Sequence, residues 1–247
     1  MKNSVDFQAF APRTPKMRLF FTPKTFALAS GLALAMSVWP GQAWAQPAGK
    51  LSTAITVDRV SFEQLQDNYS AGNSWMLAKV ELTAHSNPDA QAINPKWVKD
   101  VSVTLTLGWG TSGTPPQLDL AVAATAKLVA VQVNTSTVVM FFVPPEFLQS
   151  GSKNPDGLSA SSQPTYYVAQ VSAGGTQIDP GRMAVSSNSL PNQNYIDGFL
   201  RASGEQTSKN AGMMLTADSV PAYISLAAAQ KANGASIPTL RSSAPAM

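Results

Sequence analysis

The chain has 247 residues, no cysteine, and 17 basic against 14 acidic side chains, which gives a formal net charge of +3. Without cysteine the protein cannot use disulfides, thiol catalysis, thiolate-bound zinc or iron–sulfur clusters. The length is sufficient for one sizeable domain or two small ones whose cores need no covalent staples.

Residues 17–45 have the sequence pattern of a cleaved export signal. Arg18 and Lys24 precede an apolar run at 26–39, and an Ala-Trp-Ala sequence then supplies the small residues that a signal peptidase recognises, with cleavage before Gln46. The apolar run of about 14 residues is shorter than the roughly 20 that a membrane-spanning helix needs, which favours a cleaved signal over an anchor. The sequence therefore predicts export through the general secretory route, to the periplasm or the cell exterior.

The predicted cut changes the charge balance of the chain. Residues 1–16 show no pattern, so we expect translation to begin at Met17, in which case this segment has no structural role. Five of the 17 basic residues and one of the 14 acidic residues precede the cut, which leaves 12 basic and 13 acidic residues. A chain so close to neutral gives no argument for a nucleic-acid partner. Since a lipid anchor at the cut requires cysteine, we also predict no stable membrane anchor after cleavage.

Short segments between turn signals predict strands through most of residues 46–188. The first segment, 51–62, alternates imperfectly between apolar and polar side chains, and 64–73 has the composition of a turn. Two clearer strands follow at 74–85 and 101–109, where every second side chain is apolar. The apolar faces consist of Met76, Ala78, Val80, Leu82 and Ala84 in one strand and of Val101, Val103, Leu105, Leu107 and Trp109 in the other.

Further strands are expected before and after a patternless segment at 145–164, which we interpret as a loop or a hairpin tip. Gly174 and Gly175 predict a tight turn between two of these strands. Seven to nine short strands between turn signals indicate a mainly β fold, an immunoglobulin-like antiparallel β-sandwich. The further strands are expected at 118–122, 127–133, 137–143, 166–172, 176–178 and 183–186.

The chain acquires helical character after residue 188. One apolar stripe at helical spacing predicts a helix at 192–205, and Ser219 is positioned to cap a second helix at 219–232. Residues 189–234 are therefore predicted to form a helical extension packed on the sandwich, and 235–247 are expected to be disordered. The stripe consists of Tyr195, Ile196, Phe199 and Leu200.

The segments SWMLAKVELTAH and DVSVTLTLGW, which follow an export signal, resemble the strands of the secreted immunoglobulin-like accessory proteins of Gram-negative pilus-type assembly loci. The resemblance covers residues 51–186 and is one of strand pattern. It departs from a minimal sandwich in the helical extension. The resemblance implies a binding or scaffolding role in the envelope and brings no catalytic site with it.

The residues that could support catalysis do not form a recognisable motif. His85 is the only histidine, so a serine-type triad would need it as the base, yet it stands beside a turn and no G-x-S-x-G motif accompanies it. Acidic residues that could pair for glycoside hydrolysis are already explained by strand and turn patterns. No calcium-binding motif is present, and we predict no catalytic residue, metal or cofactor. The acidic candidates are Asp58, Glu63, Asp67, Glu81, Asp100, Asp119 and Glu146.

Two tryptophans and the helical stripe are the candidate binding residues. Trp75 departs from the apolar phase of its strand, and Trp97 lies in a predicted loop between prolines and lysines. Exposed indole rings could stack on sugars, whereas the alternative is that both rings cover the ends of the sandwich. The stripe at Tyr195, Ile196, Phe199 and Leu200 either packs on the sandwich or engages a partner.

We interpret the sequence as that of an exported binding or scaffold protein of the cell envelope rather than an enzyme, with association with a pilus or secretion system as one option. An unpaired strand edge or the helical stripe would recognise an envelope protein or a second copy of the chain. A carbohydrate-binding module that uses Trp75 and Trp97 is the alternative, and a secreted hydrolase is the third hypothesis.

Overall fold

The computed structural model describes residues 53–67, 74–111, 113, 116–151, 158, 161–232 and 236–240. All of them belong to Pro47–Met247, the second of two compact units into which the chain divides. The predicted export signal and the residues before it lie outside the described part. Among the described residues, no helix is long and apolar enough to cross a membrane.

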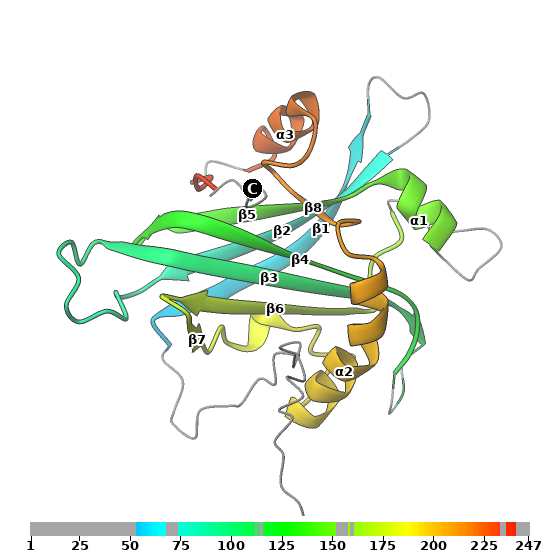
Figure 1. Cartoon of the computed structure of the whole chain (residues 1–247), viewed down its shortest axis with the longest axis horizontal. Coiled ribbons are helices and arrows are strands. Elements are labelled where there is room, and N and C mark those ends of the chain that lie inside the picture. Colours follow the sequence, from blue (N-terminus) through cyan, green and yellow to red (C-terminus); the bar gives the residue numbers. More distant parts are fainter. Residues whose placement is uncertain are drawn as a thin grey trace, which may run out of the picture. The chain divides into compact units, whose positions relative to one another are not determined.

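Two four-stranded antiparallel sheets form the fold (Figure 1). The strand order is β1-β2-β5-β8 in the first sheet and β4-β3-β6-β7 in the second. The order β1-β2-β5 corresponds to strands A, B and E of an immunoglobulin-type sandwich and β4-β3-β6-β7 to C′, C, F and G, whereas β8 comes from the C-terminal region after G. The predicted sandwich with a C-terminal helical extension is thus confirmed. The strands are β1 (Ile55–Gln66), β2 (Ser74–Ala84), β3 (Trp97–Thr111), β4 (Gln117–Gln132), β5 (Ser136–Val143), β6 (Tyr166–Ala173), β7 (Thr176–Ile178) and β8 (Leu215–Thr216).

The core lies between the two sheets and contains the apolar faces predicted for β2 and β3. Met76 and Leu82 of β2 are fully buried in the same cluster as Leu105 and Leu107 of β3. Full burial of such a side chain stabilises the fold by about 1.5–3 kcal/mol before the entropy cost of ordering it. The period-two patterns at 74–85 and 101–109 therefore predicted the two central strands correctly.

A β-bulge explains the imperfect alternation of the first strand. The register between β1 and β2 shifts between Val57 and Arg59, so Asp58 is an extra residue without a partner on β2. Val57 faces the core before the bulge, whereas Val60 and Phe62 face it afterwards. A strict period of two would place Val60 and Phe62 on the face opposite Val57, and the extra residue instead brings all three side chains to the core.

Three other segments differ from the predicted pattern. Residues 118–122 and 127–133 belong to one long strand, β4, rather than to two strands. The patternless segment begins with a short helix, α1 (Pro145–Gly151). Proline favours the first position of a helix because its fixed φ is helical and because an N–H at that position would have no acceptor within the helix. The strand expected at 183–186 is replaced by the 3-10 helix η1 (Arg182–Ala184), after which Val185 makes a single bridge to Val168.

Helix α2 (Gln193–Lys209) covers the outer face of the second sheet (Figure 1). The side chain of Asn192 caps it by accepting hydrogen bonds from the N–H groups of Asn194 and Tyr195. Phe199 is fully buried and its ring stacks on Tyr166 with ring centroids 5.3 Å apart. A Cβ atom on Gly108 would lie 2.7 Å from the Phe199 ring, so the glycine allows the helix to approach β3 closely.

Helix α3 (Ala222–Ala229) covers the outer face of the first sheet. It follows Pro221 and buries Ile224 and Ala228 against β2 and β5. The sheet is therefore covered on both faces, which explains why β2 is buried along almost its whole length rather than on one face only.

Candidate functional site

Strand β4 is the long edge strand of the second sheet, since β3 pairs with one of its sides and no described strand pairs with the other. Two contacts identify which main-chain groups face outward. The carbonyl of Ala121 accepts a hydrogen bond from Asn210 Nδ2 at 2.9 Å, and the N–H of Val129 donates to the carbonyl of Thr239 at 3.0 Å. Alternate residues of a strand point the same way, so the groups of Ala123 and Thr125 also face outward.

The edge of β4 is hydrogen-bonded at both ends, whereas its middle forms no hydrogen bonds with described residues, although β8 lies near this strand. Asn210 covers it near Ala121, and residues 236–240 cover it at Leu128 and Val129. Residues 236–240 lie in the segment that we expected to be disordered, and they also pair with β5 at Thr137. No described residue forms a hydrogen bond with the outward main-chain groups of Ala123 or Thr125. The stretch between these covered ends, residues 122–126, is about 17 Å long at roughly 3.4 Å per residue, and we call it the open stretch.

The side chains along this open stretch differ between the two faces of the sheet. Val122 and Ala126 are buried on the core side. Thr125 is exposed on the outer side and shares a hydrogen bond of 2.8 Å with Thr104 of β3. Lys127 is exposed beside it and makes no ion pair with any described residue. An added strand would meet small apolar groups on one face and a hydroxyl and an ammonium group on the other.

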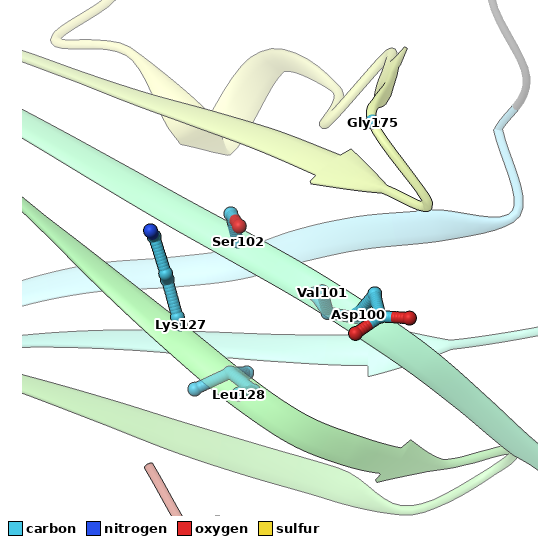
Figure 2. A pocket seen from close by; sticks show the side chains of 6 residues that line it. All are labelled: Asp100, Val101, Ser102, Lys127, Leu128 and Gly175. Atoms are coloured by element: carbon cyan, nitrogen blue, oxygen red, sulfur yellow. The ribbon is translucent and has the colours of Figure 1, made fainter. Parts of the chain in front are cut away.

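A shallow hollow of about 200 Å³ lies beside this stretch, on the outer face of the second sheet. Figure 2 shows the side chains of Lys127 and Ser102 pointing to the same side, with Asp100 farther along β3 near the turn that contains Gly175. Asp100 has a backbone φ of 55°, and its carbonyl accepts a hydrogen bond from the N–H of Gly174 at 3.1 Å. The β6–β7 turn thus holds the end of the hollow in place.

The two candidate tryptophans have different environments. Trp75 is buried with Leu65 and Leu77 beneath α3, and its exposed fraction of 9% leaves no ring face on which a sugar could stack. Trp75 departs from the apolar phase of β2 because α3 covers the outer face of that strand. Trp97 is 41% exposed and is the first residue of β3, paired with Gln132, rather than part of a loop. Only Trp97 retains the exposure that sugar stacking requires.

The helical stripe packs on the sandwich. Phe199 is fully buried, and the remaining three side chains are partly buried against the same cluster on β4 and β6. The sequence left two alternatives for this stripe, packing on the sandwich or binding a partner. Because the stripe packs on the sandwich, its apolar surface is not available for a partner. Those three side chains are Tyr195, Ile196 and Leu200.

His85 belongs to an exposed hydrogen-bonded group that does not have the order of a catalytic triad. Its Nε2 lies 2.9 Å from Thr56 Oγ1. Asp58 accepts hydrogen bonds from Thr56 at 3.3 Å and from Thr83 at 2.6 Å. A triad requires the carboxylate to orient the histidine, whereas this carboxylate orients two threonines. Within the described part of the chain, no group of three or more His, Asp or Glu side chains is arranged to hold a metal ion.

Lys79, the charged side chain that is buried among the described residues, holds α3 on the first sheet. The side chain of Lys79 is 3% exposed beneath the C-terminal end of α3, where it forms an ion pair with Glu63 and donates to the carbonyl of Lys231 at 3.1 Å. Lys231 in turn donates to the carbonyl of Gln64 at 3.0 Å. At the other end of α3, Asp67 accepts hydrogen bonds from Trp75 and Tyr223. These contacts fix α3 on the first sheet.

The sequence predicted an unpaired strand edge as a binding site but did not show which strand would provide it. The sequence of β4 contains small residues around Ala123 that blur its alternation, and no local pattern distinguishes an edge strand from a central one. The position of Lys127 is the one signal, because lysine is common on exposed edges, where it discourages unwanted pairing.

Comparison with known proteins gives little further guidance. No family model matches the chain, and no curated protein matches it. Among solved structures, it is similar to a protein from Akkermansia muciniphila with 13% sequence identity and a TM-score of 0.38, over 55% of this chain and 73% of that one. A TM-score at this level does not establish a shared fold.

Proposed function

We propose that this chain is an exported binding or scaffold protein of the cell envelope that recognises a partner by accepting an extended segment along the open edge of β4. The observation that carries this proposal is the stretch at 122–126, where the outward main-chain groups of Ala123 and Thr125 have no hydrogen-bond partner among the described residues although both ends of the same edge are covered. The leader pattern at 17–45 supports the envelope as the compartment.

Strand addition uses main-chain hydrogen bonds for affinity and side-chain contacts for specificity. Ala123 and Thr125 together offer two donors and two acceptors to an incoming strand. At about 0.5–1.5 kcal/mol net for each hydrogen bond, the ladder would contribute about 2–6 kcal/mol. Burial of the partner's apolar side chains next to Val122 and Ala126 would add to this contribution.

The partner is an envelope protein or a second copy of the chain. The resemblance of the strand pattern to accessory proteins of pilus-type assembly loci favours a partner from such a locus. Light scattering separates the two cases, because self-pairing doubles the mass of the purified protein. Two copies joined edge to edge would be related by a two-fold axis, since each copy supplies the same strand.

A proline at position 125 tests the proposal. Because the N–H of Thr125 faces away from β3, Thr125→Pro removes an edge donor and leaves the β3–β4 ladder complete. Thr125→Ala is the matched control, since both variants lose the hydrogen bond to Thr104 and only one loses the N–H. Ala123→Pro repeats the test two residues away.

The wild-type protein and Thr125→Ala should capture the same partner from an envelope extract, or should dimerise equally, and both proline variants should not. Circular dichroism of all four proteins checks that the sheet content is unchanged. Equal capture or equal dimerisation by all four would refute strand addition at this edge.

Glycan binding through Trp97 is a second candidate, because the ring is 41% exposed at the start of β3. A glycan array probed with wild-type protein, Trp97→Ala and Trp97→Phe distinguishes it. Binding that is lost in the alanine variant and retained with phenylalanine would support stacking. Binding that persists without an aromatic ring would exclude it.

A further inference from the structure

Residues 236–240 pair with the edge of β4 in a defined register. Leu240 lies opposite Leu128 in an antiparallel bridge, and the N–H of Val129 donates to the carbonyl of Thr239 at 3.0 Å. Leu240 is partly buried against the core cluster that contains the fully buried Leu128. Directly opposite residues of two paired strands share one face, so the side chains and the main chain give the same register.

The direction of this pairing leads the chain after Leu240 along the open stretch. In an antiparallel pair, each step forward in one strand is a step backward in the other, so residues 241–246 would fall opposite residues 127–122. A segment of this length spans about 20 Å in an extended strand, and the open stretch requires about 17 Å. The chain therefore carries, directly after its contact with β4, a segment with the length and the direction that the open stretch needs.

The sequence of residues 241–246 also has the alternation that the register requires. Even-numbered residues would share the core-side face of Leu240, and odd-numbered residues would share the outer face of Thr125 and Lys127. Because β8 lies near β4, room beside the edge is limited, and small side chains suit it. The core-side residues would be Ser242, Ala244 and Ala246, and the outer residues would be Arg241, Ser243 and Pro245.

We propose that residues 241–246 pair with β4 along the open stretch, as an internal strand that a partner must displace. The pairing itself follows from the register of Leu240 and Leu128. Its consequence for partner binding rests on the proposed strand addition. The segment is then an autoinhibitory contact at the proposed binding edge.

Two features of the segment make its pairing weak enough to be displaced. Arg241 would lie opposite Lys127, and like charges directly opposite each other destabilise a strand pair. Pro245 would lie opposite Ala123 and has no N–H to donate to its carbonyl. The amide of Ala123 therefore still exchanges with water in the free protein. A partner strand that lacks these two defects pairs with the same edge more strongly.

A pair of engineered cysteines tests the register, because the chain has no cysteine of its own. Thr125 and Ser243 would lie directly opposite each other with Cα atoms about 5.5 Å apart, a distance that a disulfide spans. The full-length Thr125→Cys/Ser243→Cys variant should form an intramolecular cross-link when it is treated with oxidised glutathione. In the matched control, Thr125→Cys/Ser242→Cys, the second thiol belongs to the opposite face, so the cross-link should form at least about tenfold more slowly.

Mass spectrometry of the intact and digested proteins, without reduction, measures both rates. Equal rates in the two double variants, or no cross-link in either, would overturn the pairing. A cross-link that forms only between two molecules and doubles the mass would also overturn it, because the segment on the edge would then belong to another copy.

Capture from the envelope extract distinguishes this inference from the proposed function. The oxidised Thr125→Cys/Ser243→Cys protein should neither capture the partner nor dimerise, and reduction should restore the activity, whereas the single variant Thr125→Cys should respond to neither treatment. Capture that persists in the cross-linked protein would refute strand addition at this edge and leave the pairing standing. If no cross-link forms and Thr125→Pro still abolishes capture, the pairing is overturned and strand addition stands.

Discussion

The ion pair beneath α3 makes a measurable prediction about how the helix is held. Lys79 is 3% exposed and Glu63 is 34% exposed, and Lys79 also donates to the carbonyl of Lys231 at the end of the helix. Glu63→Gln would leave a buried ammonium group whose negative partner is gone. Removal of one member of a buried ion pair costs about 3–5 kcal/mol, and because a third of Glu63 reaches water we expect a cost of about 2–3 kcal/mol.

Lys79→Met should behave differently, because it removes the buried charge and keeps an unbranched side chain in the same space. Replacement of a buried charge by a hydrophobic residue of similar volume is often neutral or stabilising. The variant loses the hydrogen bond to the carbonyl of Lys231, so we expect a net change within about 1 kcal/mol. The double variant should resemble Lys79→Met alone, since no buried ammonium group then remains.

Urea unfolding at pH 7, followed by tryptophan fluorescence, measures these effects, and Trp75 beneath α3 contributes to that signal. A destabilisation of about 2–3 kcal/mol corresponds to a melting temperature lower by about 5–10 °C for a domain of this size. Equal destabilisation by Glu63→Gln and Lys79→Met, with additive effects in the double variant, would show that the two side chains act independently. That result would refute the claim that the buried ammonium group of Lys79 is stabilised by Glu63.

Three further predictions concern the rest of the fold. Phe199→Ala should destabilise the protein by about 3–5 kcal/mol because it empties the interface between α2 and the second sheet, whereas Leu226→Ala, at a side chain 66% exposed on α3, should change stability by less than about 0.5 kcal/mol in chemical unfolding. Gly110→Ala should give little folded protein in expression trials, because its new Cβ would collide with the carbonyl oxygen of Gln117. Burial raises the pKa of Tyr167 in the folded state, so the unfolded chain loses its phenolic proton first and stability falls as the pH rises above about 10. Tyr167→Phe should lose stability less steeply in that range, and identical pH profiles would contradict the shift.

The sequence predicted most of the strands because their apolar periodicity is a direct consequence of burial on one face. It could not place the bulge at Asp58, since an imperfect alternation shows that a face changes without showing where. It also divided β4, because alanines around position 123 satisfy either face. For Trp75 the local pattern was accurate, but the partner that buries the ring is α3, almost 150 residues later, which no local pattern contains.

The candidate site was less accessible to prediction for a related reason. Whether a strand lies at an edge depends on which strands pair with it, and pairing in a sandwich joins segments that are distant in sequence. The stripe on α2 was visible from its spacing, yet the choice between packing and binding depended on an uncovered sheet face at Tyr166 and Gly108. The open groups of Ala123 and Thr125 became evident only once Asn210 and Thr239 were located at either side of them.

Amide hydrogen exchange at Ala123 and Thr125, followed by NMR with and without the captured partner, tests the central claim most directly. In the free protein both amides should exchange rapidly, while Val129, which donates to Thr239, should be protected. Binding should slow the exchange of Ala123 and Thr125 and leave amides that face β3 unchanged. Slow exchange of these two amides in the free protein, or no change on binding, would contradict partner recognition at the edge of β4.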